Sequence, residues 1–471
     1  MRKVSTAFIT SSPEKAKYRA IGKFICKAQV EHLAQRKLAH LAISKGRSIA
    51  IALLAPLSTL PGLMMTNPQA RGGPTTKREN LLALDCQGNE SVMATSLLLR
   101  SAGTYRTLPS WQRPRFGINF AGLDFGATND GQYQPNAAFP PMSQIHHFTQ
   151  QGVNLFRVPV AWPFLQPELN APLNQTSVKA YVDIIKNITA QGAFAVIDIH
   201  SYARFKGNIV GESANTPANA LADLWKRLTE LFKDNPKVLY GLSNEPHDVV
   251  IASWAKTVQE AVTAIRKAGG QNPILIPGNE YTSLQSFPKW YDTMKSVKNP
   301  DGSFDGLIFE VHRYLDGDNS GTSKECVASH VEDVKTAVAL LQKDNRQAFL
   351  GETGGGSTDS CVKLLPEFIG AITEASNSFI GWAMWAAGAF NADYPLVLTV
   401  ANASEPTGWK DQRNWLSVTT FLPKTGSPKG SGTTTSPPKP SHKSSKAARR
   451  AIGDGSGYQT HKRLRRMMMK T

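Results

Sequence analysis

Residues 238–246 read Val-Leu-Tyr-Gly-Leu-Ser-Asn-Glu-Pro, an apolar run that ends in polar residues and a proline. Such a run predicts a buried strand, and the proline predicts that the strand opens into a loop directly after Glu245. Residues 348–356, Ala-Phe-Leu-Gly-Glu-Thr-Gly-Gly-Gly, repeat this design and place Glu352 at the end of a second apolar run. One isolated Asn-Glu-Pro would indicate only a strand stop with an exposed glutamate. Two glutamates at strand ends suggest a site built from two carboxylates.

Short apolar runs of this kind recur through the middle of the chain and alternate with helical patterns. The eight predicted strands are 116–120, 155–161, 194–199, 238–242, 274–276, 307–311, 348–350 and 379–384. Helical patterns separate several of them, at 178–190, 218–233, 254–268 and 331–342. Eight strands in this alternation favour one closed (β/α)8 TIM barrel, an α/β fold, over an open doubly wound sheet. The glycines match neither a P-loop nor a dinucleotide-binding turn.

In such a barrel, all strands point their carboxyl ends at one face, where polar side chains indicate a site. The strand ends carry Arg157, His200, Asn244 with Glu245, His312 with Tyr314, Glu352, and Trp385. Each residue alone has an ordinary structural explanation, such as an ion pair, a buried histidine or a packed aromatic ring. Their joint occurrence at the ends of one set of strands favours a functional site.

The net charge of +17 belongs to the two ends of the chain. Residues 1–80 carry 14 Lys and Arg against 3 Asp and Glu, and residues 424–471 carry 12 against 1. The part between them therefore has a net charge of −5. A mildly acidic folded region argues against a nucleic-acid-binding protein, so no nucleic-acid partner is expected.

Four segments are expected from composition. Residues 1–70 form a basic extension whose apolar run at 49–65 resembles a signal or signal-anchor segment, and 71–112 form a linker. Residues 113–423 form the domain of the predicted barrel, and 424–471 a disordered basic tail rich in Ser, Pro and Lys. Because Pro56 and Pro61 interrupt the apolar run, secretion is favoured over the alternative of a type II membrane anchor.

Two further features fit a secreted protein. The triplets that begin at Asn89, Asn174, Asn187 and Asn402 are acceptors for N-glycosylation. Four cysteines are present, Cys26, Cys86, Cys326 and Cys361, and none belongs to a cluster with zinc-site spacing. Cys326 and Cys361 each follow a predicted strand, so a disulfide and two free thiols both remain open from spacing alone.

Six ordered motifs resemble glycoside hydrolase family 5, most closely the fungal endo-β-1,4-glucanase (cellulase) branch. They are Phe-Arg-Val-Pro at 156–159, Asp-Ile-His-Ser-Tyr-Ala-Arg at 198–204, Ser-Asn-Glu-Pro-His-Asp at 243–248, Val-His-Arg-Tyr-Leu-Asp at 311–316, Glu-Thr-Gly-Gly-Gly at 352–356 and Trp-Ala-Ala-Gly at 385–388. The similarity extends over residues 115–421. It implies a secreted, monomeric, retaining endoglucanase without cofactor or metal, whose partner is a β-glucan polysaccharide. The same barrel acting on mannan, xyloglucan or mixed-linkage glucan, and a catalytically idle wall protein that binds carbohydrate, are the alternatives.

The resemblance also implies roles for individual residues. Glu245 is expected to be the acid/base and Glu352 the nucleophile, with the two carboxyl groups about 5 Å apart. Hydrogen bonds from Arg157 and Tyr314 should keep Glu352 ionised, while the charge of Glu352 should favour the protonated form of Glu245. The substrate contacts carried over from the family are Asn244 at the sugar 2-hydroxyl, His200 and His312 as donors beside the −1 sugar, and Trp385 beneath its ring.

Aromatic residues that follow the strands are candidates for the walls of a sugar-binding cleft, because pyranose rings have apolar faces. These candidates are Trp162, Tyr202, Phe205, Tyr281 and Trp290. Phe205 and Tyr281 stand where related fungal enzymes often carry tryptophan, which affects the expected affinity for sugar. Cys326 and Cys361 fall where such enzymes form a disulfide.

Overall fold

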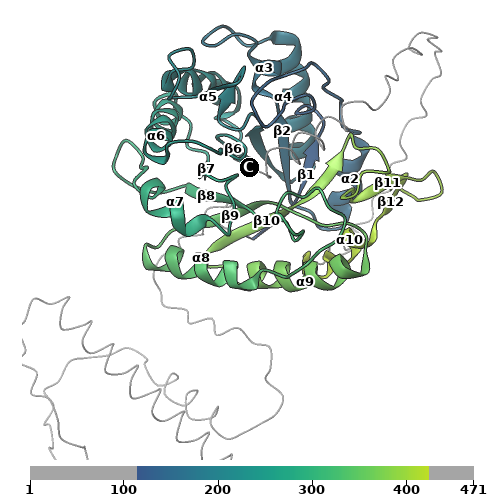
Figure 1. The fold of residues 1–471 in the computed structure, drawn as a ribbon. Coiled ribbons are helices and arrows are strands. Elements are labelled where there is room, and N and C mark those ends of the chain that lie inside the picture. Colours follow the sequence, from purple (N-terminus) through teal and green to yellow (C-terminus); the bar gives the residue numbers. More distant parts are fainter. Residues whose placement is uncertain (1–113, 424–471) are drawn as a thin grey trace, which may run out of the picture. The chain divides into compact units, whose positions relative to one another are not determined.

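The computed structural model describes residues 114–423. Their main feature is a closed barrel of eight parallel strands, in the spatial order β1-β10-β9-β8-β7-β6-β3-β2 (Figure 1). The strands are β1 (Arg115–Ala121), β2 (Leu155–Val160), β3 (Phe194–Ile199), β6 (Val238–Gly241), β7 (Ile274–Pro277), β8 (Leu307–His312), β9 (Ala348–Thr353) and β10 (Phe379–Gly388). Each strand predicted from an apolar run is present, so the (β/α)8 prediction is confirmed.

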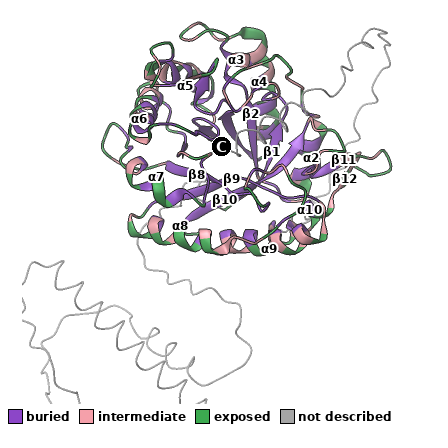
Figure 2. Cartoon of the chain, in the orientation of Figure 1, coloured by how far each residue is buried: buried purple, intermediate pink, exposed green. Residues whose placement is uncertain are grey.

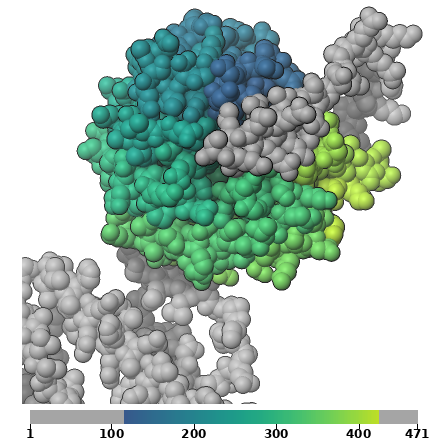
Figure 3. All heavy atoms as spheres, viewed as in Figure 1, coloured from purple at the N-terminus to yellow at the C-terminus, as the bar shows by residue number. Residues whose placement is uncertain are grey.

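Helices surround the barrel and expose their polar faces, whereas the strands are buried on both sides (Figure 2). The helices are α2 (Ser143–Gln150), α3 (Trp162–Leu165), α4 (Gln175–Ala190), α5 (Ala218–Phe232), α6 (Ile251–Lys267), α7 (Phe287–Met294), α8 (Val331–Lys343) and α9 (Asp359–Glu374). Asn174, one of the glycosylation acceptors, is the N-cap of α4 and accepts a hydrogen bond from the Ser177 amide at 3.1 Å. In the space-filling view, the colours follow the chain once round the body (Figure 3).

Smaller elements complete the fold. They are the hairpins β4 (Arg204–Phe205) with β5 (Asn208–Ile209) and β11 (Thr399–Ala401) with β12 (Trp409–Asp411), the helix α10 (Arg413–Leu416) and the 3-10 helix η2 (Thr419–Phe421). Hairpin β4-β5 follows β3 closely, on the side of the barrel where the strands end.

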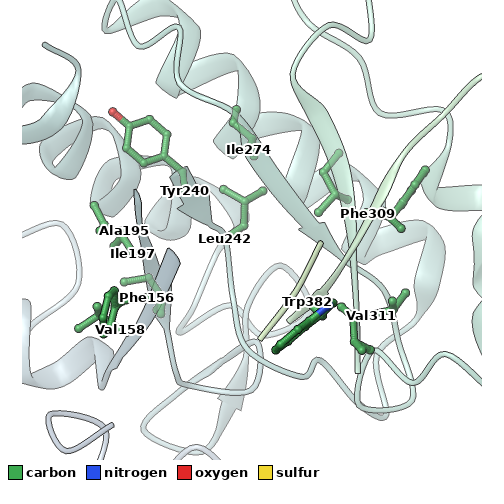
Figure 4. Close-up of a cluster of buried hydrophobic side chains, with 14 of the residues drawn as sticks. Phe156, Val158, Ala195, Ile197, Tyr240, Leu242, Ile274, Phe309, Val311 and Trp382 are labelled. Carbon is green, nitrogen blue, oxygen red and sulfur yellow. The ribbon is translucent and has the colours of Figure 1, made fainter. Parts of the chain in front are cut away.

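Side chains alternate along each strand between the inside of the barrel and the shell of helices. Along β8, Phe309 and Val311 belong to the outer core, which Figure 4 shows together with residues of β2, β3, β6 and β7. Ile308 belongs instead to an apolar layer inside the barrel. The members of that layer are Leu155, Phe194, Val196, Leu239, Leu275, Ile308, Phe349, Ile380 and Ala383. This layer closes the lower part of the barrel, so the polar side chains further along the same strands gather above it.

A disulfide joins Cys326, in the loop after β8, to Cys361, in the first turn of α9. The pairing implied by the family resemblance is thereby confirmed. A Cβ on Gly355 would lie 2.4 Å from the Cys326 sulfur and 2.5 Å from the Cys361 sulfur. The bridge therefore packs directly on the glycine run that follows β9.

The predictions for the extension 1–70, the linker 71–112 and the tail 424–471 lie outside the described residues. The same holds for Asn89, Cys26 and Cys86. Within residues 114–423, no helix combines the length and the apolar character that crossing a bilayer requires.

Candidate active site

Glu352 lies near the end of β9 and is 2% exposed. One carboxylate oxygen, Oε1, accepts a hydrogen bond from Arg157 Nη1 at 2.7 Å. The other, Oε2, accepts one from the Tyr314 hydroxyl, also at 2.7 Å. Hydrogen bonds to both oxygens fix the position and orientation of the carboxylate. Glu352 thus has the surroundings that a nucleophilic carboxylate needs.

Glu245 lies four residues beyond the end of β6 and is 3% exposed. Its backbone has φ 41°, in the left-handed region that residues with a Cβ enter at a cost of roughly 1–3 kcal/mol. Its Oε1 is 3.0 Å from His312 Nδ1, and the same nitrogen is 3.8 Å from Glu352 Oε2. One carboxylate oxygen each of Glu245 and Glu352 and one ring nitrogen of His312 all lie within 4.8 Å of one another. The two strand-end glutamates of the sequence therefore face each other across one histidine.

His312, at the end of β8, lies among three carboxylates. Besides Glu245 and Glu352, its Nε2 is 3.4 Å from Glu310 Oε1. Burial lowers the pKa of His312, but the charge of Glu352 and the hydrogen bonds with Glu245 and Glu310 outweigh burial and raise this pKa to about 9. His312 and Glu245 therefore hold a proton between their facing atoms at neutral pH.

Arg157, on β2, is fully buried beneath this site. Its guanidinium is surrounded by five oxygens from five parts of the barrel, and every one of its nitrogens has a partner. The partners are Glu310 Oε1 on Nε at 2.8 Å, Asn119 Oδ1 at 3.0 Å and Glu352 Oε1 at 2.7 Å on Nη1, and Asn244 Oδ1 at 2.8 Å and Asp198 Oδ1 at 3.1 Å on Nη2. Burial lowers the pKa of Arg157, but the surrounding carboxylates, Asp198 foremost, raise it further.

His200 and Asn244 lie at the ends of neighbouring strands and contact each other, with Asn244 Nδ2 3.2 Å from His200 Nε2. The other ring nitrogen of His200 is 2.9 Å from Asp198 Oδ2. Burial is the largest single influence and lowers the pKa of His200, but the hydrogen bond and charge of Asp198, together with the charges of Asp124 and Glu352, raise this pKa overall. The Trp385 ring stacks on His200, with centroids 5.8 Å apart and planes at 24°. The structure therefore brings all of the strand-end residues together at one end of the barrel.

Three buried polar residues of this site were not predicted: Asn119 on β1, Asp198 on β3 and Glu310 on β8. Two of them could have been found from the period-two alternation of strands. Asp198 stands two residues before His200, and Glu310 two residues before His312. A charged residue inside an apolar strand, in phase with a strand-end histidine, must face the barrel interior with it.

The aromatic candidates divide into two groups. Trp162 is 1% exposed and packs edge-on against Phe205, itself 3% exposed, so these two rings face each other more than solvent and their contact with a sugar stays a prediction. Trp290 is 2% exposed within α7 and belongs to the hydrophobic core.

Tyr202 and Tyr281 lie closer to the site. The Tyr202 hydroxyl is 3.4 Å from His200 Nε2, although the side chain is fully buried and offers no ring face to solvent. Tyr281 is half-buried and stacks on His247, with centroids 4.3 Å apart and planes at 12°. Of the predicted cleft residues, Tyr281 is therefore the one whose position suits contact with a sugar.

Known proteins share this arrangement. A family model described as Cellulase (glycosyl hydrolase family 5) matches residues 118–388. The manganese dependent endoglucanase Eg5A of Phanerodontia chrysosporium is 39% identical over 325 residues, which cover 68% of this chain and 84% of that protein. Endoglucanase EG-II of Hypocrea jecorina is 38% identical over 314 residues, or 63% of this chain and 74% of that protein.

The fold agrees with these matches. The crystal structure of Cel5A (EG2) from Hypocrea jecorina superposes with a TM-score of 0.63 at 36% sequence identity, over 67% of this chain and all of that one. The matched family model spans more than half of the chain, from β1 to the end of β10. This protein belongs to glycoside hydrolase family 5, the cellulase family.

Proposed function

We propose that the protein is a retaining endo-β-1,4-glucanase, with Glu352 as nucleophile and Glu245 as acid/base. The observation that carries the proposal is the approach of two buried carboxylates, which place oxygens within 4.8 Å of each other. Retaining glycosidases keep their carboxyl groups about 5–5.5 Å apart, whereas inverting enzymes separate them by about 6.5–9.5 Å. The endoglucanase names of the most similar relatives support β-1,4-glucan as the substrate.

In the first step, a Glu352 oxygen attacks the anomeric carbon while the bond from that carbon to the glycosidic oxygen breaks. The proton of Glu245 passes to the departing oxygen, which leaves as a hydroxyl group on the released glucan. The Glu352 oxygen now forms an ester bond with the sugar. Arg157 and Tyr314 hold the carboxylate in place for this attack through their bonds to its two oxygens.

In the second step, Glu245 takes a proton from water, and the water oxygen attacks the anomeric carbon. The ester bond breaks and returns both the Glu352 carboxylate and the protonated Glu245. Esterification removes the negative charge of Glu352, so Glu245 ionises more readily at this stage than in the free enzyme. One carboxyl group can therefore act first as acid and then as base.

This mechanism routes no step through a metal ion. Manganese dependence stands in the name of one relative, and Glu245, His312 and Glu352 do offer three clustered donor atoms. The cluster nevertheless does not fit a resident divalent cation. The Arg157 guanidinium already bonds Glu352 Oε1 at 2.7 Å, so a second cation between the carboxylates would be repelled, and His312 Nδ1 is turned towards Glu245.

The test is reducing-sugar release by the full chain on carboxymethylcellulose, barley β-glucan, mannan and xylan. We expect activity on the first two and its loss in Glu352→Gln, with Glu260→Gln on the exposed face of α6 as the matched control. Higher activity on mannan would assign the alternative sugar. A folded protein that degrades none of these polymers would be a carbohydrate-binding protein.

Glu245→Gln separates the two carboxyl roles. An acid/base variant should lose about 10²–10⁴ in kcat/KM on glucan, but far less in kcat/KM on an aryl cellobioside, because kcat/KM reports the first step and this leaving group needs no proton. A nucleophile variant should lose activity on both substrates. Equal losses on both substrates for Glu245→Gln would contradict the assignment of Glu245 as the acid.

We further propose that the protein is secreted. The disulfide between Cys326 and Cys361 supports this, because such bonds persist in oxidising compartments. Expression in a fungal host should place the activity in the culture medium. Activity that stays with the cells would favour the anchored alternative.

A further inference from the structure

Glu310 is a buried carboxylate that the mechanism above does not use. It lies in the interior of the barrel on β8, where TIM barrels normally carry bulky apolar residues. Its side chain is 1% exposed, and its Oε2 has no hydrogen-bond partner among the described residues. Burying an ionised carboxylate with one oxygen unsatisfied is costly. Such a residue calls for a functional explanation.

Glu310 contacts Arg157 and His312, the residues that bond the two catalytic carboxylates. Its Oε1 accepts a hydrogen bond from Arg157 Nε at 2.8 Å and lies 3.4 Å from His312 Nε2. Arg157 in turn holds Glu352, and His312 contacts Glu245. Arg157, His312, Glu352 and Glu245 thus join Glu310 in one network of charged groups from β2, β8, β9 and the loop after β6. Burial raises the pKa of Glu310, but Arg157 and then His312 outweigh it and lower this pKa, so Glu310 is an anion.

The neighbouring strand leaves room for this contact. Gly351 on β9 lies beside Glu310, and a Cβ there would approach Glu310 Oε1 to 2.4 Å and His312 Nε2 to 2.9 Å. Any residue with a side chain at 351 would push the carboxylate and the imidazole apart. The glycine that precedes Glu352 therefore has a specific function in the packing of the site.

An ionised carboxylate can only accept hydrogen bonds, so the Nε2 of His312 must carry a hydrogen where it meets Glu310. The other ring nitrogen, Nδ1, then faces Glu245 Oε1 at 3.0 Å with a single proton between the two atoms. That proton lies on Nδ1 when Glu245 is ionised and on Glu245 when the ring is neutral. The same logic explains how the aspartate of a Ser-His-Asp triad fixes its histidine.

We propose that Glu310 is a positioning residue that orients the His312 ring and retains, between His312 and Glu245, the proton that the acid/base donates. The inference rests on the proposed function for the role of Glu245. Glu310 touches neither substrate nor reacting atom in this account. It acts through His312, and the two protons of the pair titrate together rather than on separate residues.

Glu310→Gln tests the proposal, because it keeps the shape of the side chain and removes its charge. Loss of one nearby anion should lower the pH at which His312 loses its proton by about one unit or more. The basic limb of the pH profile of kcat should shift in the same direction, while KM changes little. The measurements are a ¹⁵N NMR titration of the histidine side chains of the full chain, assigned with His312→Gln, and kcat on barley β-glucan from pH 4 to 9.

Two further variants keep the test decisive if Glu310→Gln folds poorly. Glu310→Asp retains the charge, so its pH profile of kcat should have a basic limb between those of the wild type and Glu310→Gln. Gly351→Ala retains Glu310 but displaces it, and should reproduce the shift. Asp316→Asn is the control, because Asp316 is a buried carboxylate that bonds the amides of Thr322 and Ser323 instead of the site.

A lower melting temperature with an unchanged His312 titration and an unchanged basic limb would show a purely structural role and overturn the proposal. The NMR titration needs no turnover, so it tests the link between Glu310 and His312 even in a protein that cleaves no glucan. Failure of the proposed function would appear instead as a wild-type chain without hydrolytic activity.

Discussion

At the scale of single residues, the hydroxyl of Tyr314 gives the sharpest test of how Glu352 is held. It supplies one of the two hydrogen bonds to the Glu352 carboxylate, at 2.7 Å. A hydrogen bond to a charged group contributes about 1.5–3 kcal/mol, so Tyr314→Phe should lower kcat/KM by roughly 10- to 150-fold. The measurement is kcat/KM on barley β-glucan. Tyr291→Phe makes the same change where the hydroxyl bonds Leu340 O and Asp344 instead of Glu352, and it should leave activity intact. Equal activity of both variants would mean that Tyr314 does not hold the nucleophile.

His312 should also make stability depend on pH. Its pKa is about 9 in the folded protein, above the ordinary value of 6.5 that it regains on unfolding. The folded state therefore binds the proton more tightly, and this contribution is complete below pH 6.5 and lost as pH rises through 9. The melting temperature should fall between pH 6.5 and 9, and it should fall less steeply in His312→Gln. Parallel curves for the two proteins would contradict the charged imidazole.

At the scale of elements, the strands could be predicted because barrel strands are buried on both sides and appear as continuous apolar runs. The residues at their ends followed from the same pattern. Asn119, Asp198 and Glu310 were missed because each lies inside such a run, although Asp198 and Glu310 are in phase with strand-end histidines, which indicates that they face the interior. Nothing in one strand reveals that a buried charge there meets Arg157 from another strand. The contact between the Trp162 and Phe205 rings was equally hidden, since proximity to a strand end does not fix the direction of a side chain.

The disulfide links two elements on the nucleophile side of the barrel. It joins the loop after β8 to α9 and closes a segment of 35 residues. Removing a native bridge of this kind costs about 2–4 kcal/mol of stability, so Cys326→Ser with Cys361→Ser should melt several degrees lower. Activity at 25 °C should persist, because neither cysteine contacts Glu245 or Glu352. Dithiothreitol should lower the melting temperature of the wild type but not of the double variant. If dithiothreitol lowered the melting temperature of both proteins, its effect would not come from the bond between Cys326 and Cys361.

At the scale of the whole molecule, the chemistry should be complete without a metal ion. Arg157 and His312 pair with the carboxylates of the site and supply positive charge there. A metal ion is therefore not needed to balance these carboxylates. Dialysis against EDTA should therefore leave kcat on barley β-glucan unchanged within about twofold, since a catalytic metal would contribute several kcal/mol. Inactivation by EDTA that manganese reverses, with no change in melting temperature, would overturn this prediction. A parallel loss of thermal stability would instead indicate a structural ion away from the carboxylates.

The arrangement around Arg157 also bears on how this enzyme can be changed. One guanidinium hydrogen-bonds four oxygens and forms an ion pair with Asp198 Oδ1, all from five separate parts of the barrel, so a change at any member of this set alters the surroundings of the others. Substitutions within it should be strongly epistatic, and double variants should fall short of the sum of their single effects. The β4-β5 and β11-β12 hairpins contribute none of these five partners of Arg157. Variant libraries that aim at new polysaccharides should therefore change residues in these hairpins and keep Arg157 and its five partners unchanged.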